Sequence, residues 1–180
     1  MIDNRKSGLQ EGENMKTRLL RAVMLTVFVM FSLANIAYAS MPSISADDTK
    51  FDFFSGCYML TGNVTVKTDS RIIKADRAKV SLASKEVWAD GNIYLEEPDQ
   101  QITFTGGSLY AADDTKTAVV KGGVKFERPG MVVEAEECSF NWRTKVAEFD
   151  DLVEVTRDGK KEVYNVFKYD VVQDKVIEAK

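Results

Sequence analysis

The residues that could carry out chemistry in this sequence are carboxylates and two cysteines. Its 180 residues include no histidine, and histidine is the commonest general base and a favoured zinc ligand. Acidic pairs occur at 47–48, 96–97, 113–114, 136–137 and 150–151. Most of them border expected turns, where a solvated charge is the ordinary explanation, and no calcium-loop pattern appears. We therefore predict that the protein is not an enzyme and uses no metal or cofactor.

Cys57 and Cys138 could form a disulfide in an oxidising compartment. Cys138 holds a position that small residues hold elsewhere in the pattern described below, so a buried thiol that packs as a small hydrophobe is the simpler interpretation. The run 54–57 (FSGC) has the form of a lipoprotein processing box, but four charged residues separate it from the apolar N-terminal segment. We expect no lipidation, and the redox state of the cysteines stays open.

Apolar periodicity, rather than reactive groups, dominates the chain after residue 56. Small or apolar residues stand at every second position in the runs 58–66, 87–95, 118–126 and 147–155, and matching positions are 29, 31 and 29 residues apart. Alternation with a period of two places these side chains on one face of a strand. The recurrence of the runs predicts a β-repeat with one long apolar inner face.

A second pattern follows each run. The set Ile73, Ala75, Ala78 and Val80 aligns at a constant offset of 30 with Thr103, Thr105, Ser108 and Tyr110, and again with Val133, Ala135, Cys138 and Phe140. The step of three inside each set predicts a β-bulge. In the fourth unit the same offset gives Val163, Asn165, Lys168 and Asp170, whereas the apolar residues are Phe167, Tyr169 and Val171, so its register is open.

Glycines inside the strand patterns indicate where the strands bend. Gly62, Gly91 and Gly122 occupy one column, and glycine relieves the steric cost of a sharp bend. Bends in register would fold long strands into two facing sheets with free edges at the first and last units. The sequence therefore predicts an all-β, repeat-built, open two-sheet antiparallel fold.

The N-terminal 39 residues differ from the rest. Three basic residues precede an apolar run over 22–34, and the small residues Ala37 and Ala39 stand before Ser40, which is the order of a secretory signal peptide with a helical apolar region. We predict a signal peptide over 1–39 that is cleaved near Ala39/Ser40, a tether over 40–50 and a repeat domain over 51–180. An uncleaved inner-membrane anchor is the alternative.

Charge argues against one class of partner. Residues 1–39 contain five basic and three acidic residues, so the remaining chain changes from the total of −4 to a formal charge of −6. Affinity for nucleic acid depends on a basic surface that neutralises phosphates. We expect no nucleic-acid partner, and the export signal predicts a location outside the cytoplasm.

The phrases 60–66 (LTGNVTV), 73–78 (IKADRA) and 89–95 (ADGNIYL) resemble the repeated motifs of the OstA/LptA family of lipopolysaccharide-transport proteins. The resemblance extends from about Phe51 to the C-terminus. It departs in the third unit, where Gly123 replaces the asparagine, and in the fourth, where Asp150-Asp151 replaces Gly-Asn. The resemblance implies a β-jelly roll, open along one side, that works in the periplasm.

The resemblance also implies a function and partners. Acyl chains of lipopolysaccharide or a related glycolipid would lie on the apolar inner face, and edge strands would join other transport components or a second copy. The alternatives are an envelope assembly module that holds no lipid, and a membrane-anchored component similar to LptC. The expected lipid-lining residues are Leu60, Val64, Val66, Ile73, Ala75, Ala78, Val80, Val87, Ala89, Ile93, Leu95, Val120, Val124, Phe126, Val133, Ala135, Phe140, Phe149 and Val153.

Two smaller groups of residues complete the expected site. Lys74, Arg77 and Lys79 lie in a basic cluster of the first unit and could contact lipid phosphates, although a solvated outer face explains them as well. Val176 and Ile177 lie in the last expected strand. An unpaired last strand recruits other strands, so these two residues are the expected pairing edge.

Overall fold

The structure is a computed structural model that describes residues 43–68 and 70–180. Antiparallel strands make up nearly all of this part, with one turn of 3-10 helix, and none of its helical segments has the length and apolar character of a bilayer span. The predicted signal peptide over 1–39 and its cleavage site lie outside the described residues. The elements are β1 (Ser43–Ser45), β2 (Asp48–Asp52), β3 (Cys57–Thr68), β4 (Arg71–Ser81), β5 (Glu86–Glu97), η1 (Pro98–Gln100), β6 (Ile102–Ala112), β7 (Thr117–Arg128), β8 (Met131–Asn141), β9 (Val146–Arg157), β10 (Lys160–Asp170) and β11 (Lys175–Ala179).

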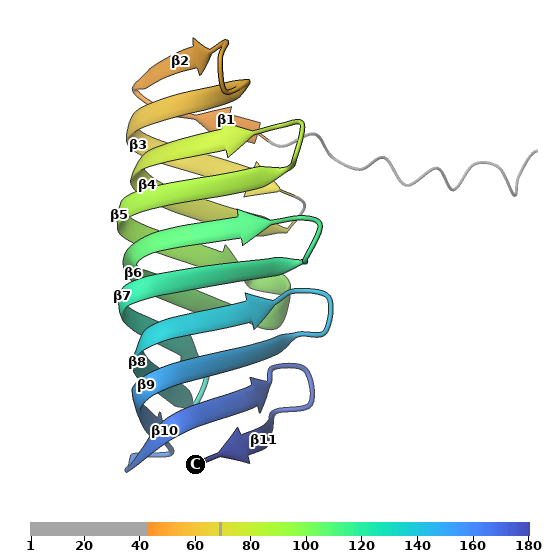
Figure 1. The fold of residues 1–180 in the computed structure, drawn as a ribbon. Helices are drawn as coiled ribbons and strands as arrows, with labels where there is room; N and C mark the ends of the chain where they lie inside the picture. Colours follow the sequence, from red (N-terminus) through yellow and green to blue (C-terminus); the bar gives the residue numbers. More distant parts are fainter. Residues whose placement is uncertain (1–42, 69) are drawn as a thin grey trace, which may run out of the picture. The chain divides into compact units, whose positions relative to one another are not determined.

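The strands form one continuous meander. From β3 to β11 each strand pairs antiparallel with the next, and β1 and β2 both pair with the outer side of β3. Figure 1 shows the strands stacked in chain order from β2 to β11. The predicted all-β, open antiparallel fold is confirmed. The two facing layers are the two halves of one folded sheet, because the hydrogen-bonded ladder continues through the bends.

Each of the 12-residue strands β3, β5, β7 and β9 bends at a pair of residues with left-handed backbone. The pairs are 62–63, 91–92, 122–123 and 151–152, with φ between 46° and 82°. The pairing register shifts at each pair, since two residues of one strand face one residue of the next. The fourth pair is Asp151-Leu152, one residue later than the Asp150-Asp151 expected from the sequence.

A neighbouring aspartate holds each of the first two bends, and it is Asp47, between β1 and β2, for the first and Asp76 of β4 for the second. Asn92 Nδ2 donates to Asp76 Oδ2 at 2.8 Å, and Asn63 Nδ2 donates to Asp47 Oδ2 at the same distance. A Cβ at Gly91 would lie 2.4 Å from Asp76 Oδ2. Glycine is therefore required at Gly91 for its backbone conformation and also for this close approach.

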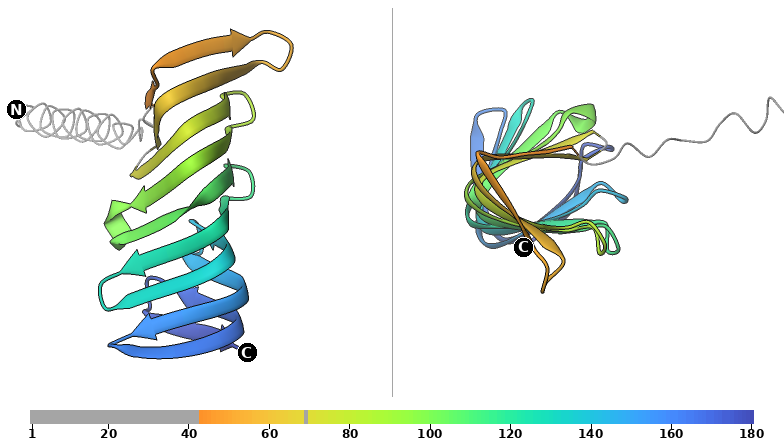
Figure 2. Two further views of the ribbon diagram at one scale, coloured as in Figure 1. Left: turned by 90° about the vertical axis from the view of Figure 1, so that its left-hand side faces the viewer. Right: turned by 90° about the horizontal axis from the view of Figure 1, so that it is seen from above.

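The bends divide each strand between two layers, with the apolar columns between them. In Figure 1 the bends lie on the left and the loops of the front layer lie on the right, and the right-hand view of Figure 2 shows the folded profile from above. One row of turns consists of the loops 53–56, 82–85, 113–116, 142–145 and 171–174, and the other of the turns 98–101, 129–130 and 158–159, in line with the connection between β3 and β4. We call the line along which these two rows face each other the seam.

The structural repeat is 29 residues, with one insertion. The turn between β5 and β6 contains η1 and is two residues longer than the turns at 129–130 and 158–159. The offset across that turn is therefore 31, which the constant offset of 30 missed. Phe104, Leu109 and Ala111 are buried on the inner side of β6, and a one-residue slip reverses every side chain of a strand. Thr103, Thr105, Ser108 and Tyr110 accordingly belong to the outer face.

The register of the fourth unit follows from the same repeat. At an offset of 29, Phe167 and Tyr169 match Cys138 and Phe140, and both pair with inner residues of β9. Both side chains are buried, whereas Val163 is exposed. The apolar residues that departed from the 30-residue alignment are therefore the inner ones.

Strands occupy most of the segment that was expected to be a tether. Ile44 pairs with Val66 and Thr49 with Leu60, so β1 and β2 together act as a half-unit one repeat before β4. The sequence indicates this extra half-unit, because 44–47 (ISAD) repeats 73–76 (IKAD) at an offset of 29. Residues 43–50 therefore belong to the sheet, and the ladder begins before Phe51.

The bend at Gly91 gives a stability prediction. Gly91→Ala should lower the free energy of unfolding by about 1–2 kcal/mol through its left-handed backbone and by a further ~1–3 kcal/mol through the collision with Asp76. Gly159→Ala is the control, because Gly159 has φ +77° but nothing within 4 Å of its added Cβ. Urea unfolding of both variants checks the difference. Equal losses would contradict the role of Asp76, and Asp76→Ala should recover part of the Gly91→Ala loss.

Candidate functional site

The interior between the layers is continuous and apolar. All of the expected lining residues are buried except Ala135, which is half-buried and packs against the same core. The core extends from Leu60 of β3 to Val171 after β10. The structure thus brings the expected residues together on one surface, and their contact with lipid stays a prediction.

Sequence reasoning missed a set of aromatic and aliphatic residues in this interior. Phe104, Phe167 and Tyr169 are among its largest fully buried side chains. Phe104 was missed because the 30-residue offset placed its neighbours Thr103 and Thr105 on the inner face. Phe167 and Tyr169 were missed because the register of the fourth unit was left open. Alignment at 29 residues, with the insertion at η1, is the signal that would have found them.

Aromatic rings close the interior at its C-terminal half. The ring centroids of Phe104 in one layer and Phe140 in the other are 5.4 Å apart, and those of Phe126 and Phe149 are 5.5 Å apart. Tyr169 continues the cluster at 6.4 Å from Phe126. These contacts join the two layers directly. Acyl chains that entered this half of the interior would have to displace these contacts between aromatic rings.

Both cysteines are buried and free. Burial raises the pKa of the Cys138 thiol well above its ordinary value, so the reactive thiolate is disfavoured there. Cys138 packs in the inner core, as the sequence indicated. Cys57 donates a weak hydrogen bond from its Sγ to the Ser55 carbonyl at 3.3 Å.

The expected phosphate contacts lie on the outer face, opposite the inner columns. Lys74 and Arg77 are exposed, and the Nζ atoms of Lys74 and Lys79 lie 5.2 Å and 5.1 Å from the ring centres of Tyr94 and Trp88. Their contact with lipid phosphate stays a prediction.

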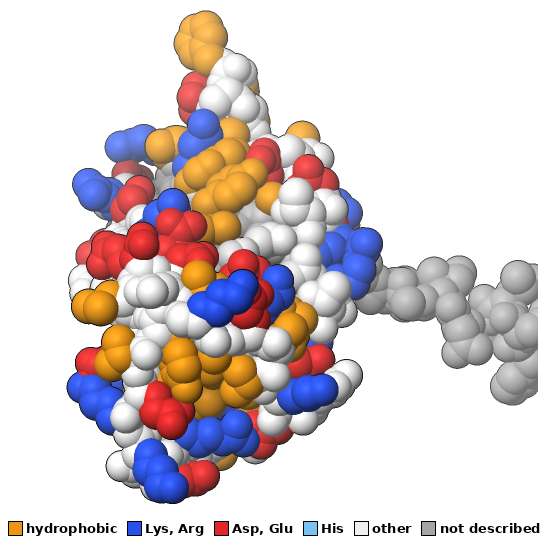
Figure 3. All heavy atoms as spheres, turned by 60° about the horizontal axis from the view of Figure 1, so that its bottom comes forward, with side chains coloured by type: hydrophobic (Ala, Val, Ile, Leu, Met, Phe, Trp, Pro, Cys, Tyr) orange, Lys and Arg blue, Asp and Glu red, His pale blue; other side chains and the backbone are white. Residues whose placement is uncertain are grey.

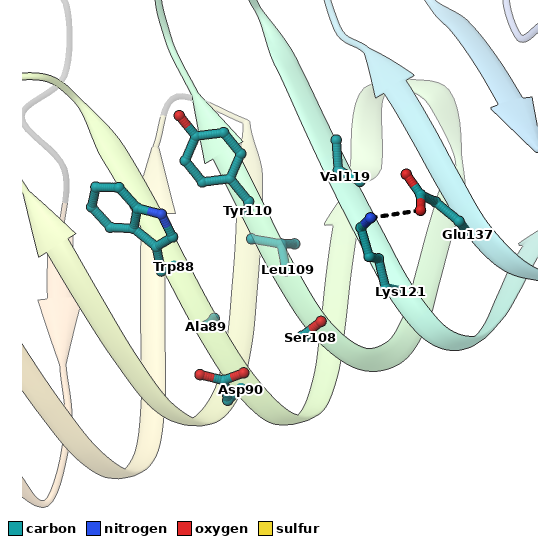
Figure 4. Close-up of a pocket in the computed structure, with 9 residues that line it drawn as sticks. All are labelled: Trp88, Ala89, Asp90, Ser108, Leu109, Tyr110, Val119, Lys121 and Glu137. Atoms are coloured by element: carbon teal, nitrogen blue, oxygen red, sulfur yellow. Dashed lines mark ion pairs between the residues drawn. The ribbon is translucent and has the colours of Figure 1, made fainter.

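A shallow hollow of about 480 Å³ also lies on the outer face. Figure 4 shows Trp88 and Tyr110 side by side in it, with the ion pair between Lys121 and Glu137 at 2.6 Å on a neighbouring pair of strands. This hollow is separate from the apolar interior, because its polar and aromatic side chains occupy the outward positions of their strands.

Charged residues continue the apolar columns at the seam. Glu97, Arg128 and Arg157 each stand two residues beyond the last apolar residue of an inner column, at the ends of β5, β7 and β9. Sequence reasoning treated Glu97 only as half of an acidic pair. Its position in the column Ile93, Leu95, Glu97 was the available signal.

The first group of seam contacts centres on Glu97, whose side chain is only 1% exposed. Arg71 Nε donates to Glu97 Oε2 at 2.8 Å, and Lys145 Nζ donates to Oε1 at 2.5 Å. Lys145 belongs to the facing row of loops, so this ion pair crosses the seam. The Arg71 guanidinium also lies 4.5 Å from the ring centre of Trp142 in that loop.

The second group of contacts crosses the seam one repeat further along. Arg128 Nη1 donates to the Val171 carbonyl at 3.0 Å and to the Tyr169 hydroxyl, and Arg157 Nη2 donates to Asp174 Oδ1 at 2.9 Å. Burial raises the pKa of the Tyr169 hydroxyl to about 12. The hydrogen bond from that hydroxyl lowers the pKa of Asp174, and the two guanidinium groups add to this effect.

We call these two groups of contacts the seam clasps. The first is made by Arg71, Glu97, Trp142 and Lys145, and the second by Arg128, Arg157, Tyr169 and Asp174. Among the described residues, no set of three or more His, Cys, Asp and Glu side chains is placed to bind a metal.

Comparison with known proteins agrees with this architecture. Residues 43–175 match the family model described as LptA/(LptD N-terminal domain) LPS transport protein. The chain belongs to this family. Family membership gives the chain a role in lipopolysaccharide transport. The match agrees with the resemblance noted in the sequence from about Phe51 onward and extends it to the residues of β1 and β2 before Phe51.

A solved structure shows the same fold. LptH is described as the LptA homologous periplasmic component of the conserved lipopolysaccharide transport device from Pseudomonas aeruginosa. It superposes with a TM-score of 0.58 at 17% identity, over 62% of this chain and 83% of LptH. No curated protein sequence matches the chain. The LptH likeness supports the open β-jelly roll.

The first seam clasp gives a second stability prediction. Glu97→Gln leaves two partly buried cations without a carboxylate partner, so the free energy of unfolding should fall by about 3 kcal/mol. Glu96→Gln, which removes the neighbouring carboxylate on the outer face, should change it by less than about 1 kcal/mol. The midpoints of urea unfolding curves measure both effects, provided that the dependence of the unfolding free energy on urea concentration is unchanged. Similar effects at the two positions would contradict a clasp centred on Glu97.

Proposed function

We propose that the chain is a non-enzymatic periplasmic carrier and bridge in lipopolysaccharide transport. In this proposal the inner columns shield acyl chains, and the free edges of the sheet join partner proteins or a second copy. Family membership supplies the transport role. The likeness to a periplasmic transport component and the predicted signal peptide support the location.

The observation that carries the proposal is the uninterrupted apolar interior. It extends through every strand from β3 to β10, and its columns end in charges only where the strands reach the seam. Each methylene that moves from water into such an interior contributes about 0.8 kcal/mol. A surface of this length suits long acyl chains, while the charged seam suits a polar group that stays in water.

The sheet edges support the bridging part of the proposal. At the C-terminal end β11 pairs only with the last part of β10, and within the described chain residues 160–164 have no partner strand on that side. Val163, Val172, Val176 and Ile177 are exposed there. Figure 3, which turns this end toward the viewer, shows hydrophobic side chains in patches between charged ones. Such an edge can accept another strand.

A second candidate function is an assembly module that holds no lipid. The aromatic contacts between Phe104 and Phe140, and between Phe126 and Phe149, favour it, because they fill the C-terminal half of the interior. In that case only the sheet edges would bind partners. An uncleaved anchor, as in LptC, concerns residues outside the described part, and the N-terminal residue of the mature protein decides it.

Site-specific photocrosslinking tests the carrier proposal. A probe at Ile93 or Val124, which face the interior, should give lipid adducts in cells that make labelled lipopolysaccharide. The same probe at Tyr94 or Lys125, which stand next to them in sequence on the outer face, should give none. Adducts at neither pair, from a folded and exported protein, would favour the assembly module.

Proline substitution tests the free edge. Successive N–H groups point to opposite sides of a strand, so one of Val176 and Ile177 presents its N–H to the open side of β11. Proline lacks this donor, and concentration-dependent association should weaken by at least tenfold in Val176→Pro or Ile177→Pro. Val176→Thr keeps the donor and should associate like the original chain. Sedimentation equilibrium measures the effect, and unchanged association in both proline variants places the contact elsewhere.

A further inference from the structure

The two seam clasps raise the question of how a long apolar ligand reaches an interior that is closed. The inner columns are buried, and the ion pair between Glu97 and Lys145 joins the two rows of turns. Arg128 joins them again through the Val171 carbonyl. Acyl chains that insert from the side must separate these contacts first.

We propose that the cations of the seam clasps are the binding site for the phosphate groups of a phosphorylated amphiphile, and that these phosphates displace Glu97 and Asp174 when the seam opens. The cations are Arg71, Lys145, Arg128 and Arg157. This inference rests on the proposed carrier function, because the same ligand must place its acyl chains among the inner columns.

The position of the seam cations makes them a better phosphate site than the cations of the outer face. An amphiphile whose chains lie among the inner columns has its polar group where those columns end, and Arg128 and Arg157 are the residues that end two of them. Lys74, Arg77 and Lys79 lie on the opposite side of the sheet from the columns. A phosphate attached to buried chains therefore meets the seam before it can meet them.

Charge favours an anion as the ligand. The clasps contain four cations and two carboxylates, in a chain whose formal net charge is −4. Each carboxylate is shared by two cations, so the clasps carry a net charge of +2. Phosphate oxygens form charge-assisted hydrogen bonds with guanidinium and ammonium groups, so a ligand with two phosphates would match this excess.

Exchange of one anion for another lets the seam open at little electrostatic cost. Removing Glu97 alone would leave Arg71 and Lys145 partly buried and unpaired, which is strongly destabilising. A phosphate that takes the place of the Glu97 carboxylate keeps both cations paired while the two rows of turns move apart. An apolar ligand without phosphate lacks this exchange and has to break the clasps.

Lipid binding by the mature chain tests the site. The original chain should bind diphosphoryl lipid A at least tenfold more tightly than monophosphoryl lipid A. Lys145→Gln combined with Arg157→Gln should remove this preference while binding of the monophosphoryl lipid persists. The matched control neutralises Lys74, Arg77 and Lys79 to glutamine and should keep the preference. Arg157→Gln alone, at a side chain 42% exposed, provides a variant that folds if the double variant does not.

The buried thiol reports opening of the seam. In a Cys57→Ser background Cys138 is the only thiol, and its maleimide labelling should accelerate at least tenfold with diphosphoryl lipid A. Inorganic pyrophosphate should not have this effect. Equal acceleration by pyrophosphate would show a response to free phosphate and overturn the assignment to a lipid.

The outcomes separate the inference from the function on which it rests. A preference for the diphosphoryl lipid that survives in the seam variants, or is lost in the outer-face control, overturns the phosphate site and leaves the carrier function standing. Failure of the original chain to bind either lipid overturns both. Loss of the preference in the seam variants alone, together with lipid-dependent labelling of Cys138, supports the site.

Discussion

The other features of this fold depend on the left-handed bend that interrupts every second long strand, in β3, β5, β7 and β9. A meander of alternating strands would otherwise form a sheet with one fully apolar face in water. The paired left-handed residues at 62–63, 91–92, 122–123 and 151–152 fold that sheet on itself in register. Its two halves then bury each other's apolar faces, and its turns collect in two facing rows.

The chemistry of the bend changes along the chain. The first two bends use glycine and asparagine with an aspartate from the neighbouring segment of the chain, whereas the third uses two glycines. The fourth places Asp151 and Leu152 in the left-handed region, which L-residues adopt at a cost. Pairing with both neighbouring strands holds this backbone in place, because Asp150 pairs with Glu137 and Val166 before the bend and Glu154 pairs with Glu134 and Val163 after it.

The interior consists of buried apolar side chains, whereas the seam is lined by charged side chains. Burial of the columns stabilises the closed chain without any ligand, and aromatic contacts between the layers add to this in the C-terminal half. In the proposed carrier function these contacts would be exchanged for contacts with acyl chains. Charges at the column ends would make such an exchange selective, because they place the polar boundary of the interior at the seam.

The sequence by itself determined the strand class, the repeat and the identity of most inner residues, because side-chain alternation along a strand is a local property. It also carried the transport-family motifs. It did not determine the register of β6 or β10, because the assumed constant offset of 30 differs by one residue from the true offsets, which are 31 across η1 and 29 elsewhere, and a one-residue slip reverses the faces of a strand. Only the tertiary structure decided that Glu97 meets Lys145, 48 residues away, and that Arg128 meets Tyr169, 41 residues away. Those pairings depend on how far the twisted layers shift one row of turns against the other, which is a property of the stacked sheet rather than of any one strand.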